Sequence, residues 1–137
     1  MKTLLVATDG SKNALRALHF ALDLADEISA HVRLLYVQPK INSTPLIAQS
    51  VIDEHYERQT KLAFADALRL VSKRRVKART EMVLGDPATT IIAYARKYRC
   101  SQIVIGNRGH GTLKGFLVGS VALKVIYLAG VPVTLVK

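Results

Sequence analysis

The chain has 137 residues, half of them apolar, which is a usual size for one domain with its own core, so we expect a single domain over residues 1–137. Its formal net charge of +10 attracts anions of every class, from nucleotides and nucleic acids to acidic proteins and anionic membranes. The one cysteine, Cys100, excludes an intrachain disulfide and a cysteine-based zinc site. No apolar run reaches the length of a signal peptide or a membrane span, so we expect a cytoplasmic protein with no membrane partner.

Apolar runs and amphipathic segments alternate through the first half of the chain. The expected elements are a strand over Thr3–Thr8, a helix that Ser11 caps and that ends near Ser29, a strand over His31–Val37, a loop over Gln38–Gln49 and a helix over Ser50–Ser72. In the first helix, leucines and alanines at helical spacing predict a buried face, and Ile28 continues it. The loop is long for a compact domain, which favours a functional role.

The second half continues the alternation and contains a strong helix-start signal. Asp86 stands at an N-cap position, and Pro87 follows at the first helical position. The expected elements are a strand over Ala78–Leu84, a helix from Pro87, a strand over Gln102–Ile105, a glycine-rich loop over Gly106–Gly119, a helix over Ser120–Leu128 and a strand over Val133–Val136.

Five strands that alternate with four helices predict an α/β domain with a parallel sheet and helices on both faces. Right-handed crossovers favour the strand order 3-2-1-4-5, in which the first and fourth strands are neighbours. Helices leave these two strands toward opposite faces, so a crevice opens above their carboxyl ends, at Asp9-Gly10 and Gly106-Asn107-Arg108-Gly109. We expect a ligand site there.

The segment Gly106–Ser120 carries five of the eight glycines and stands before a helix. Glycines let a ligand approach the main chain, and a helix N-terminus attracts anions. Ser120 adds a hydroxyl, while Arg108 and Lys114 add positive charge. These features predict a polyphosphate site, and the alternative is a surface loop without a ligand. The spacing matches neither a Walker loop nor a dinucleotide fingerprint.

These residues also carry a family resemblance. The segment resembles the nucleotide motif G-x2-G-x9-G-[S/T] of the universal stress protein family. Its matching residues are Gly106, Gly109, Gly119 and Ser120. The resemblance extends to the opening strand that ends Ala-Thr-Asp-Gly-Ser, to Gly85-Asp86-Pro87 and to the closing Val-Pro-Val-Thr-Leu-Val. It implies the adenine nucleotide alpha hydrolase-like fold and the subgroup of the family that binds ATP.

By this resemblance, four residues are expected to hold the phosphates of ATP, with the main chain of Val121 beside them. They are Gly106, Gly109, Gly119 and Ser120. Where ATP-binding relatives often carry a second hydroxyl residue, this chain has Ala122, so one phosphate contact is expected to be missing. His110 lies within the same loop and is expected to have no special role.

The resemblance places the rest of the nucleotide at the ends of the first two strands. Thr8 and Asp9 are expected at the adenosine and metal side, and Val37 is expected to meet adenine through its main chain. Asp9 is a candidate ligand of Mg²⁺ through water, and the alternative is that it shapes the turn into the first helix. The remaining candidate binding residues are Ala7, Ile105 and Arg108.

No nucleophile, base and orienting acid converge in the sequence, so we predict ATP binding with no catalytic residues and at most weak hydrolysis. Two alternatives stay open. One is a basic dimeric interaction module that does not retain ATP and engages acidic proteins or nucleic acid, and the other is a phosphoryl or nucleotidyl transferase. We attribute the basic run Lys73–Arg79 and the cluster Arg96, Lys97 and Arg99 to solvated helix ends, because no nucleic-acid motif accompanies them.

The last strand, Val133–Val136, follows Pro132 and is expected at an edge of the sheet. An edge strand is a template for pairing with another protein molecule. The family resemblance implies an antiparallel homodimer formed through this strand.

Overall fold

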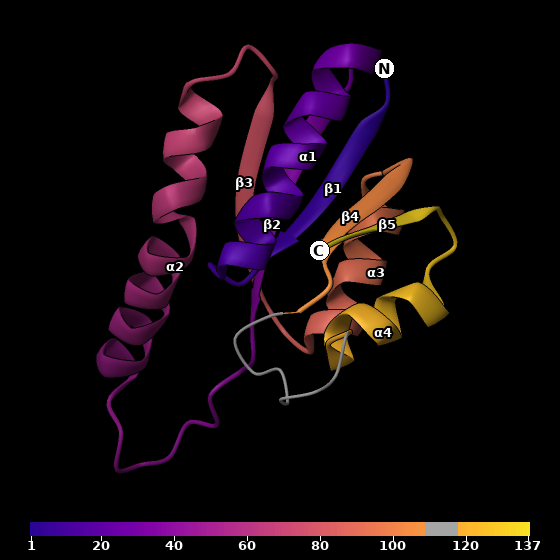
Figure 1. Cartoon of the computed structure of the whole chain (residues 1–137). Helices are drawn as coiled ribbons and strands as arrows, with labels where there is room; N and C mark the ends of the chain where they lie inside the picture. The colour runs from indigo at the N-terminus through magenta and orange to yellow at the C-terminus, as the bar shows by residue number, and fades with distance from the viewer. Residues whose placement is uncertain (109–117) are drawn as a thin grey trace.

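The computed structural model describes residues 1–108 and 118–137 (Figure 1). The described part of the protein forms β1 (Thr3–Thr8), α1 (Lys12–Ile28), β2 (His31–Gln38), α2 (Gln49–Ser72), β3 (Ala78–Leu84), α3 (Pro87–Lys97), β4 (Gln102–Gly106), α4 (Ser120–Leu128) and β5 (Val133–Val136). Every predicted strand and helix is present, and no predicted boundary is wrong by more than one residue. Within the same residues, no helix combines the length and the apolar character that crossing a bilayer requires.

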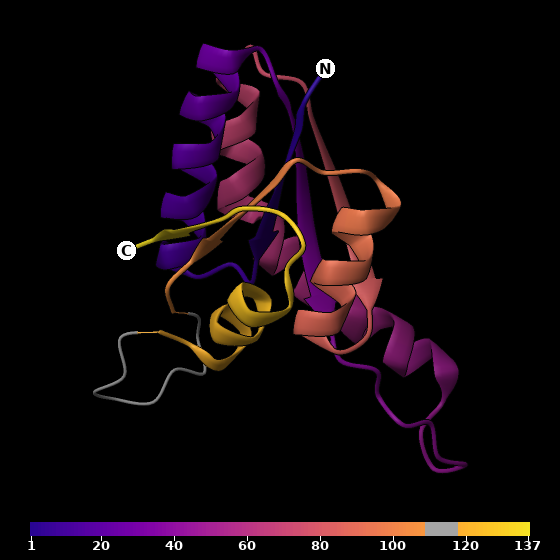
Figure 2. The same ribbon diagram turned by 90° about the vertical axis from the view of Figure 1, so that its right-hand side faces the viewer.

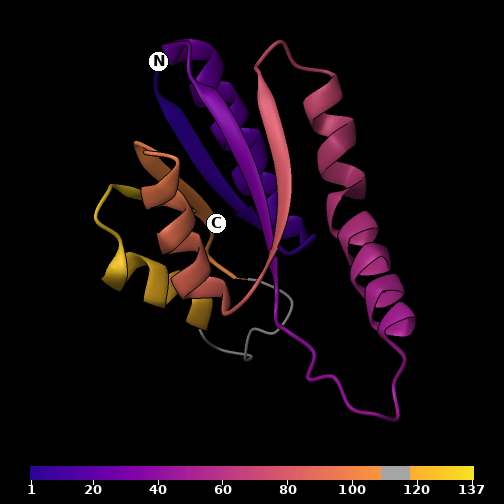
Figure 3. The same cartoon turned by 180° about the vertical axis from the view of Figure 1, so that it is seen from behind.

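The five strands form one parallel sheet in the order β3-β2-β1-β4-β5, as predicted. The central strand β1 lies between β2 and β4, with Leu4, Leu5 and Val6 paired with Gln102, Ile103 and Val104. Figures 2 and 3 show α1 and α2 on one face of the sheet and α3 and α4 on the other. The predicted fold class is therefore confirmed.

Short polar signals set the helix boundaries. The Ser11 side chain accepts a hydrogen bond from the N–H of Ala14 at 3.1 Å and caps α1. Ser29 ends the helix in the left-handed region, at φ 56°. At α3, the Asp86 carboxylate accepts from the N–H of Thr89 at 3.1 Å, and Pro87 occupies the first turn. These contacts confirm the predicted caps and fix where the backbone leaves each strand.

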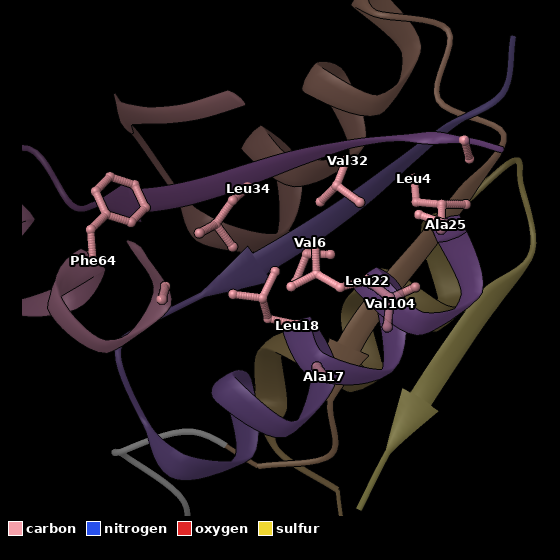
Figure 4. Close-up of a cluster of buried hydrophobic side chains, with 13 residues drawn as sticks. Leu4, Val6, Ala17, Leu18, Leu22, Ala25, Val32, Leu34, Phe64 and Val104 are labelled. Atoms are coloured by element: carbon pink, nitrogen blue, oxygen red, sulfur yellow. The ribbon is translucent and has the colours of Figure 1, made fainter. Parts of the chain in front are cut away.

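The apolar core is divided into two layers by the sheet. The layer under α1 and α2 contains Leu4, Val6, Val32, Leu34 and Val104 from the strands, Ala17, Leu18, Leu22 and Ala25 from α1, and Phe64 from α2 (Figure 4). The layer under α3 and α4 contains Leu5, Leu35, Ile91, Ile103, Ile105, Ala122 and Val125. Neighbouring residues of β1 alternate between the two layers, as the twofold repeat of a strand requires.

One predicted core position is wrong. Ile28 was expected to continue the buried face of α1, but 43% of it is exposed. It is the last residue of the helix, and the backbone turns back immediately after it. The N–H of Ala30 donates to the carbonyl of Ala25 at 2.8 Å, which brings Ala30 rather than Ile28 into this end of the core.

Two leucines provide a matched test of this packing. Leu22 of α1 is fully buried, whereas 66% of Leu62 on α2 is exposed. We expect Leu22→Ala to lower the free energy of unfolding by about 2–5 kcal/mol, because it leaves a cavity in the core. Leu62→Ala should change it by only about 0.5 kcal/mol. Urea denaturation followed by circular dichroism measures both, and equal losses would contradict the assigned packing.

Candidate functional site

An open cavity of about 290 Å³ lies at the carboxyl ends of β1, β2 and β4. It borders all ten predicted site residues that the structure describes, which come from four separate parts of the sequence. They are Ala7, Thr8, Asp9, Val37, Ile105, Gly106, Arg108, Gly119, Ser120 and Val121. Gly109 of the predicted phosphate loop, with His110 and Lys114, lies outside the described residues.

The floor of the cavity depends on the absence of a side chain at Gly106. A Cβ atom at this position would lie 3.0 Å from both the carbonyl carbon and the carbonyl oxygen of Asn13, closer than nine in ten real Cβ contacts. The first turn of α1 therefore packs directly against the end of β4. This close approach explains why the first glycine of the motif stands at the end of the strand.

The turn after β1 is held by its own polar side chains. The hydroxyl of Thr8 accepts a hydrogen bond from the N–H of Gly10 at 3.1 Å, and the Asp9 carboxylate accepts from the N–H of Ser11 at 2.9 Å. Gly10 has a φ of 82°, and a Cβ there would lie 3.0 Å from the Cα of Ala63. Asp9 thus shapes the turn, as one of the two sequence interpretations expected, and it also borders the cavity.

Asn107 holds both ends of the glycine segment. Its main-chain N–H donates to the carbonyl of Val136 at 2.8 Å, and its carbonyl accepts from the N–H of Gly119 at 2.6 Å. Its side-chain oxygen accepts a hydrogen bond from the amide of Asn13. Both asparagine side chains are buried. One residue therefore joins α1, β5 and the start of α4 around the cavity.

The sequence interpretation gave no role to Asn13 or to the side chain of Asn107. A signal was present in the sequence, because Asn13 is a polar residue beside the apolar positions of an amphipathic helix. Its partner is 94 residues away, and only the parallel sheet brings the two together.

The N-terminus of α4 lies at the cavity, and within residues 1–108 and 118–137 no side chain caps it with a hydrogen bond. Gly119 occupies the N-cap position, and the exposed Ser120 begins the helix. The first N–H groups of a helix have no partner within it and carry partial positive charge. Arg108, also exposed, lines the cavity. This side of the cavity is therefore suited to an anion.

Much of the remaining described lining of the cavity is apolar. The lining residues here that the sequence interpretation missed are Ala14, Leu35, Pro87 and Ile91. Ala122 also lines the cavity and is buried in the core layer beneath α4. The sequence could not place these side chains together, because they come from α1, β2, α3 and α4. The cavity thus combines an apolar wall with an anion-attracting helix end.

The negative charge of Asp9 affects the titration of a neighbouring tyrosine. Burial, and then the Asp9 carboxylate, raise the pKa of Tyr36, which lies on β2 beside Thr8. Cys100 lies elsewhere. It is buried in the core layer under α3 and α4, and burial raises the pKa of its thiol. Among the described residues, no group of three or more His, Cys, Asp or Glu could hold a metal ion without another ligand.

Two glycines test the cavity floor. We expect Gly106→Ala to destabilise the domain and to displace the start of α1, because its Cβ would meet the main-chain atoms of Asn13. Overpacking of this kind costs about 1–3 kcal/mol. Gly130→Ala is the control, since a Cβ there has no atom within 4 Å. Chemical denaturation and amide NMR shifts around Asn13 measure the effect, and identical behaviour of the two variants would refute the close approach.

Three comparisons relate the chain to known proteins. The model of the universal stress protein family matches residues 1–137. Universal stress protein MJ0531 of Methanocaldococcus jannaschii is 32% identical over 142 residues, which cover 99% of this chain and 82% of that protein. The structure of universal stress protein UspA from Lactobacillus plantarum matches with a TM-score of 0.87 at 26% identity, covering 99% of this chain and 97% of the other.

A further solved structure holds a ligand. The universal stress protein from Archaeoglobus fulgidus, in complex with dAMP, matches with a TM-score of 0.72 at 25% identity, and the match covers 100% of this chain and 98% of that one. The shared sheet order is that of the adenine nucleotide alpha hydrolase-like fold. The full-length family match and the identity to the Methanocaldococcus jannaschii protein agree, and the chain belongs to the universal stress protein family.

Proposed function

We propose that this protein binds ATP in the cavity above β1 and β4 and acts as a nucleotide-dependent regulatory protein of the stress response. The observation that carries the proposal is the cavity itself, which gathers the ten described candidate residues beside the N-terminus of α4. The dAMP complex of the Archaeoglobus fulgidus protein supports an adenine nucleotide as the ligand class.

The two sides of the cavity suggest how the nucleotide lies. The base and ribose belong against the apolar wall, where Val37 and Ala7 stand at the ends of their strands. The phosphates belong at the other side, where Gly106, Gly119 and Ser120 border the end of α4. Anion binding at a partly buried helix N-terminus is worth up to about 2 kcal/mol. Gly109 would complete this cradle by the family motif.

Asp9 fits the metal that accompanies ATP. Mg²⁺ is commonly bound by one or two carboxylates together with substrate phosphates and water. Asp9 is the one carboxylate among the described residues that line the cavity. One Asp9 oxygen accepts from the N–H of Ser11, which holds the side chain at the end of β1. Asp9 would therefore hold Mg²⁺ directly or through water, and the metal would neutralise part of the phosphate charge.

The proposed activity is binding rather than turnover. Within the described lining, Asp9 is the sole acidic group, and its oxygen is engaged in the turn. A phosphoryl-transfer site also needs a residue that positions the attacking group. The described cavity offers Thr8 and Ser120 as hydroxyls but no histidine or second carboxylate. We therefore expect hydrolysis to be slow or undetectable.

Two serine substitutions test the phosphate position. Ser120→Glu puts a negative charge in the first turn of α4, where it favours the helix but repels the phosphates. We expect the affinity for Mg-ATP to fall about tenfold or more, since unit charges 4 Å apart repel by about 1 kcal/mol in water and about 4 kcal/mol near a protein surface. Titration calorimetry measures the change.

The matched control is Ser50→Glu, which makes the same change in the first turn of α2, outside the cavity. It should bind ATP like the unchanged protein. Equal affinity of the two variants would sink the assignment of the phosphates to α4. Acid release and chromatography of any nucleotide that copurifies with the unchanged protein would identify the ligand independently.

We also propose that the protein forms a homodimer through β5 and α4. The carbonyls of Pro132 and Val136 accept from β4 and the residue after it, so the alternate residues Val133 and Leu135 turn their main-chain groups outward. Large apolar side chains of α4 are exposed nearby. They are Leu123, Ile126, Tyr127 and Leu128. An open strand edge continued by an apolar helix surface is suited to a second copy of the protein.

Sedimentation velocity tests the dimer. We expect the unchanged protein to sediment at twice its monomer mass of 15.0 kDa. Leu123→Gln with Tyr127→Gln should shift it toward the monomer, because these side chains lose their apolar contact. Leu62→Gln with Leu68→Gln on α2 is the control, since both leucines are also exposed. A monomeric unchanged protein, or a double α4 variant that stays dimeric, would contradict the proposal.

A further inference from the structure

Every helix-to-strand connection lies at the amino-terminal edge of the sheet, because all five strands are parallel. This edge is opposite the cavity, which borders the carboxyl ends of the strands. In Figures 1 and 3 the N-terminus and the connection from α2 to β3 both lie toward the top of the view, away from the start of α4. Basic segments that are distant in sequence are therefore brought to one edge.

Main-chain hydrogen bonds fix the lateral order of this edge. The N–H of Val32 donates to the carbonyl of Lys77 at 3.0 Å, and the N–H of His31 donates to the carbonyl of Lys2 at 2.9 Å. On the other side of β1, the N–H of Ser101 donates to the carbonyl of Thr3 at 2.9 Å. With strands about 4.8 Å apart, the row from β3 to β4 is about 14 Å wide.

Nine of the 20 Lys and Arg residues of the protein stand at or beside this row, which we call the basic edge. They are Lys2, Lys73, Arg74, Arg75, Lys77, Arg79, Arg96, Lys97 and Arg99. Arg74 pairs with Asp23 of α1 and is the one member of the set with an ion pair in the described structure. The other eight positive charges have no carboxylate partner among the described residues.

An arginine and a tyrosine extend the basic edge over the α3 face. The guanidinium carbon of Arg33 lies 3.7 Å from the ring centroid of Tyr98, and the ammonium of Lys97 lies 5.2 Å from the same ring. Arg33 also pairs in register with Arg79 on β3. A half-exposed aromatic ring flanked by cations is a feature of surfaces that bind nucleic acid.

Helix dipoles explain only part of this charge. Arg96 and Lys97 lie in the last turn of α3, where positive charge complements the helix C-terminus. Lys2, Lys77 and Arg79 instead precede or begin strands, where no helix end accounts for them. We propose that the basic edge binds the phosphate backbone of nucleic acid, at a surface separate from the ATP cavity.

The side chains of the basic edge favour nucleic acid over other anionic partners. Stable attachment to a membrane surface combines basic charge with apolar side chains that insert, and protein interfaces are depleted in lysine. Among the described residues, the large exposed apolar side chains lie mainly on α4 and around the start of α2, and Met1, Ile28 and Leu68 are those near the basic edge. A row of Lys and Arg across several strands instead matches the repeated charge of a phosphodiester backbone.

The test compares two triple variants with the same change in charge. The edge variant removes three exposed charges from the basic edge, by Lys2→Gln, Lys77→Gln and Arg79→Gln. The control variant removes three exposed charges elsewhere, by Lys40→Gln, Arg58→Gln and Lys61→Gln. Fluorescence anisotropy with 30-nucleotide single-stranded DNA, single-stranded RNA and duplex DNA is measured across a salt series. Circular dichroism confirms that both variants are folded.

We expect the edge variant to bind about tenfold or more weakly and to lose about three units of salt slope, one for each phosphate contact. The control variant should bind nearly as the unchanged protein does. Ser120→Glu should also retain nucleic-acid binding, so failure of the ATP site and failure of the basic edge are distinguishable. Equal losses in both triple variants, no loss in the edge variant, or binding to phosphatidylserine vesicles but not to oligonucleotides would overturn the proposal.

Discussion

The parallel pairing of β1 with β4 is the contact on which the rest of the molecule depends. Because α1 follows β1 on one face and α4 follows β4 on the other, the carboxyl ends of these strands diverge and leave the cavity between them. The same pairing brings Ser101 beside Thr3 at the opposite edge. One strand pair thus separates the edge that carries the cavity from the edge that is rich in Lys and Arg.

Most of the fold could be predicted because its signals are local. Caps such as Ser11 and Asp86 act within four residues, and the alternation of strands and helices limits the sheet to a few strand orders. Local signals did not predict the burial of a side chain where that burial depends on residues from another part of the fold. Ile28 has the right spacing for the core, but the reversal after Ser29 puts Ala30 there instead. The burial of Phe64 likewise depends on a distant residue, since its ring packs against Tyr36 of β2.

The candidate site was predictable to the extent that glycine spacing and strand ends define it. The ten described residues of that prediction do meet at one cavity. What the sequence could not provide is the support beneath them, because it comes from distant residues. The pair of Asn13 and Asn107 spans 94 positions, and the apolar wall combines Leu35 of β2 with Ile91 of α3. The close contact of Gly106 with Asn13 likewise requires the folded sheet.

The position of Asn107 has a consequence for communication between two surfaces. The main chain of this one residue after β4 accepts a hydrogen bond from Gly119, at the start of α4, and donates one to Val136, on the edge strand. A ligand that draws Gly119 toward it therefore acts on the same residue that anchors the last strand. Coupling of this kind is reciprocal: if occupancy of the cavity alters the edge of the sheet, then a partner bound at that edge alters affinity in the cavity by the same factor.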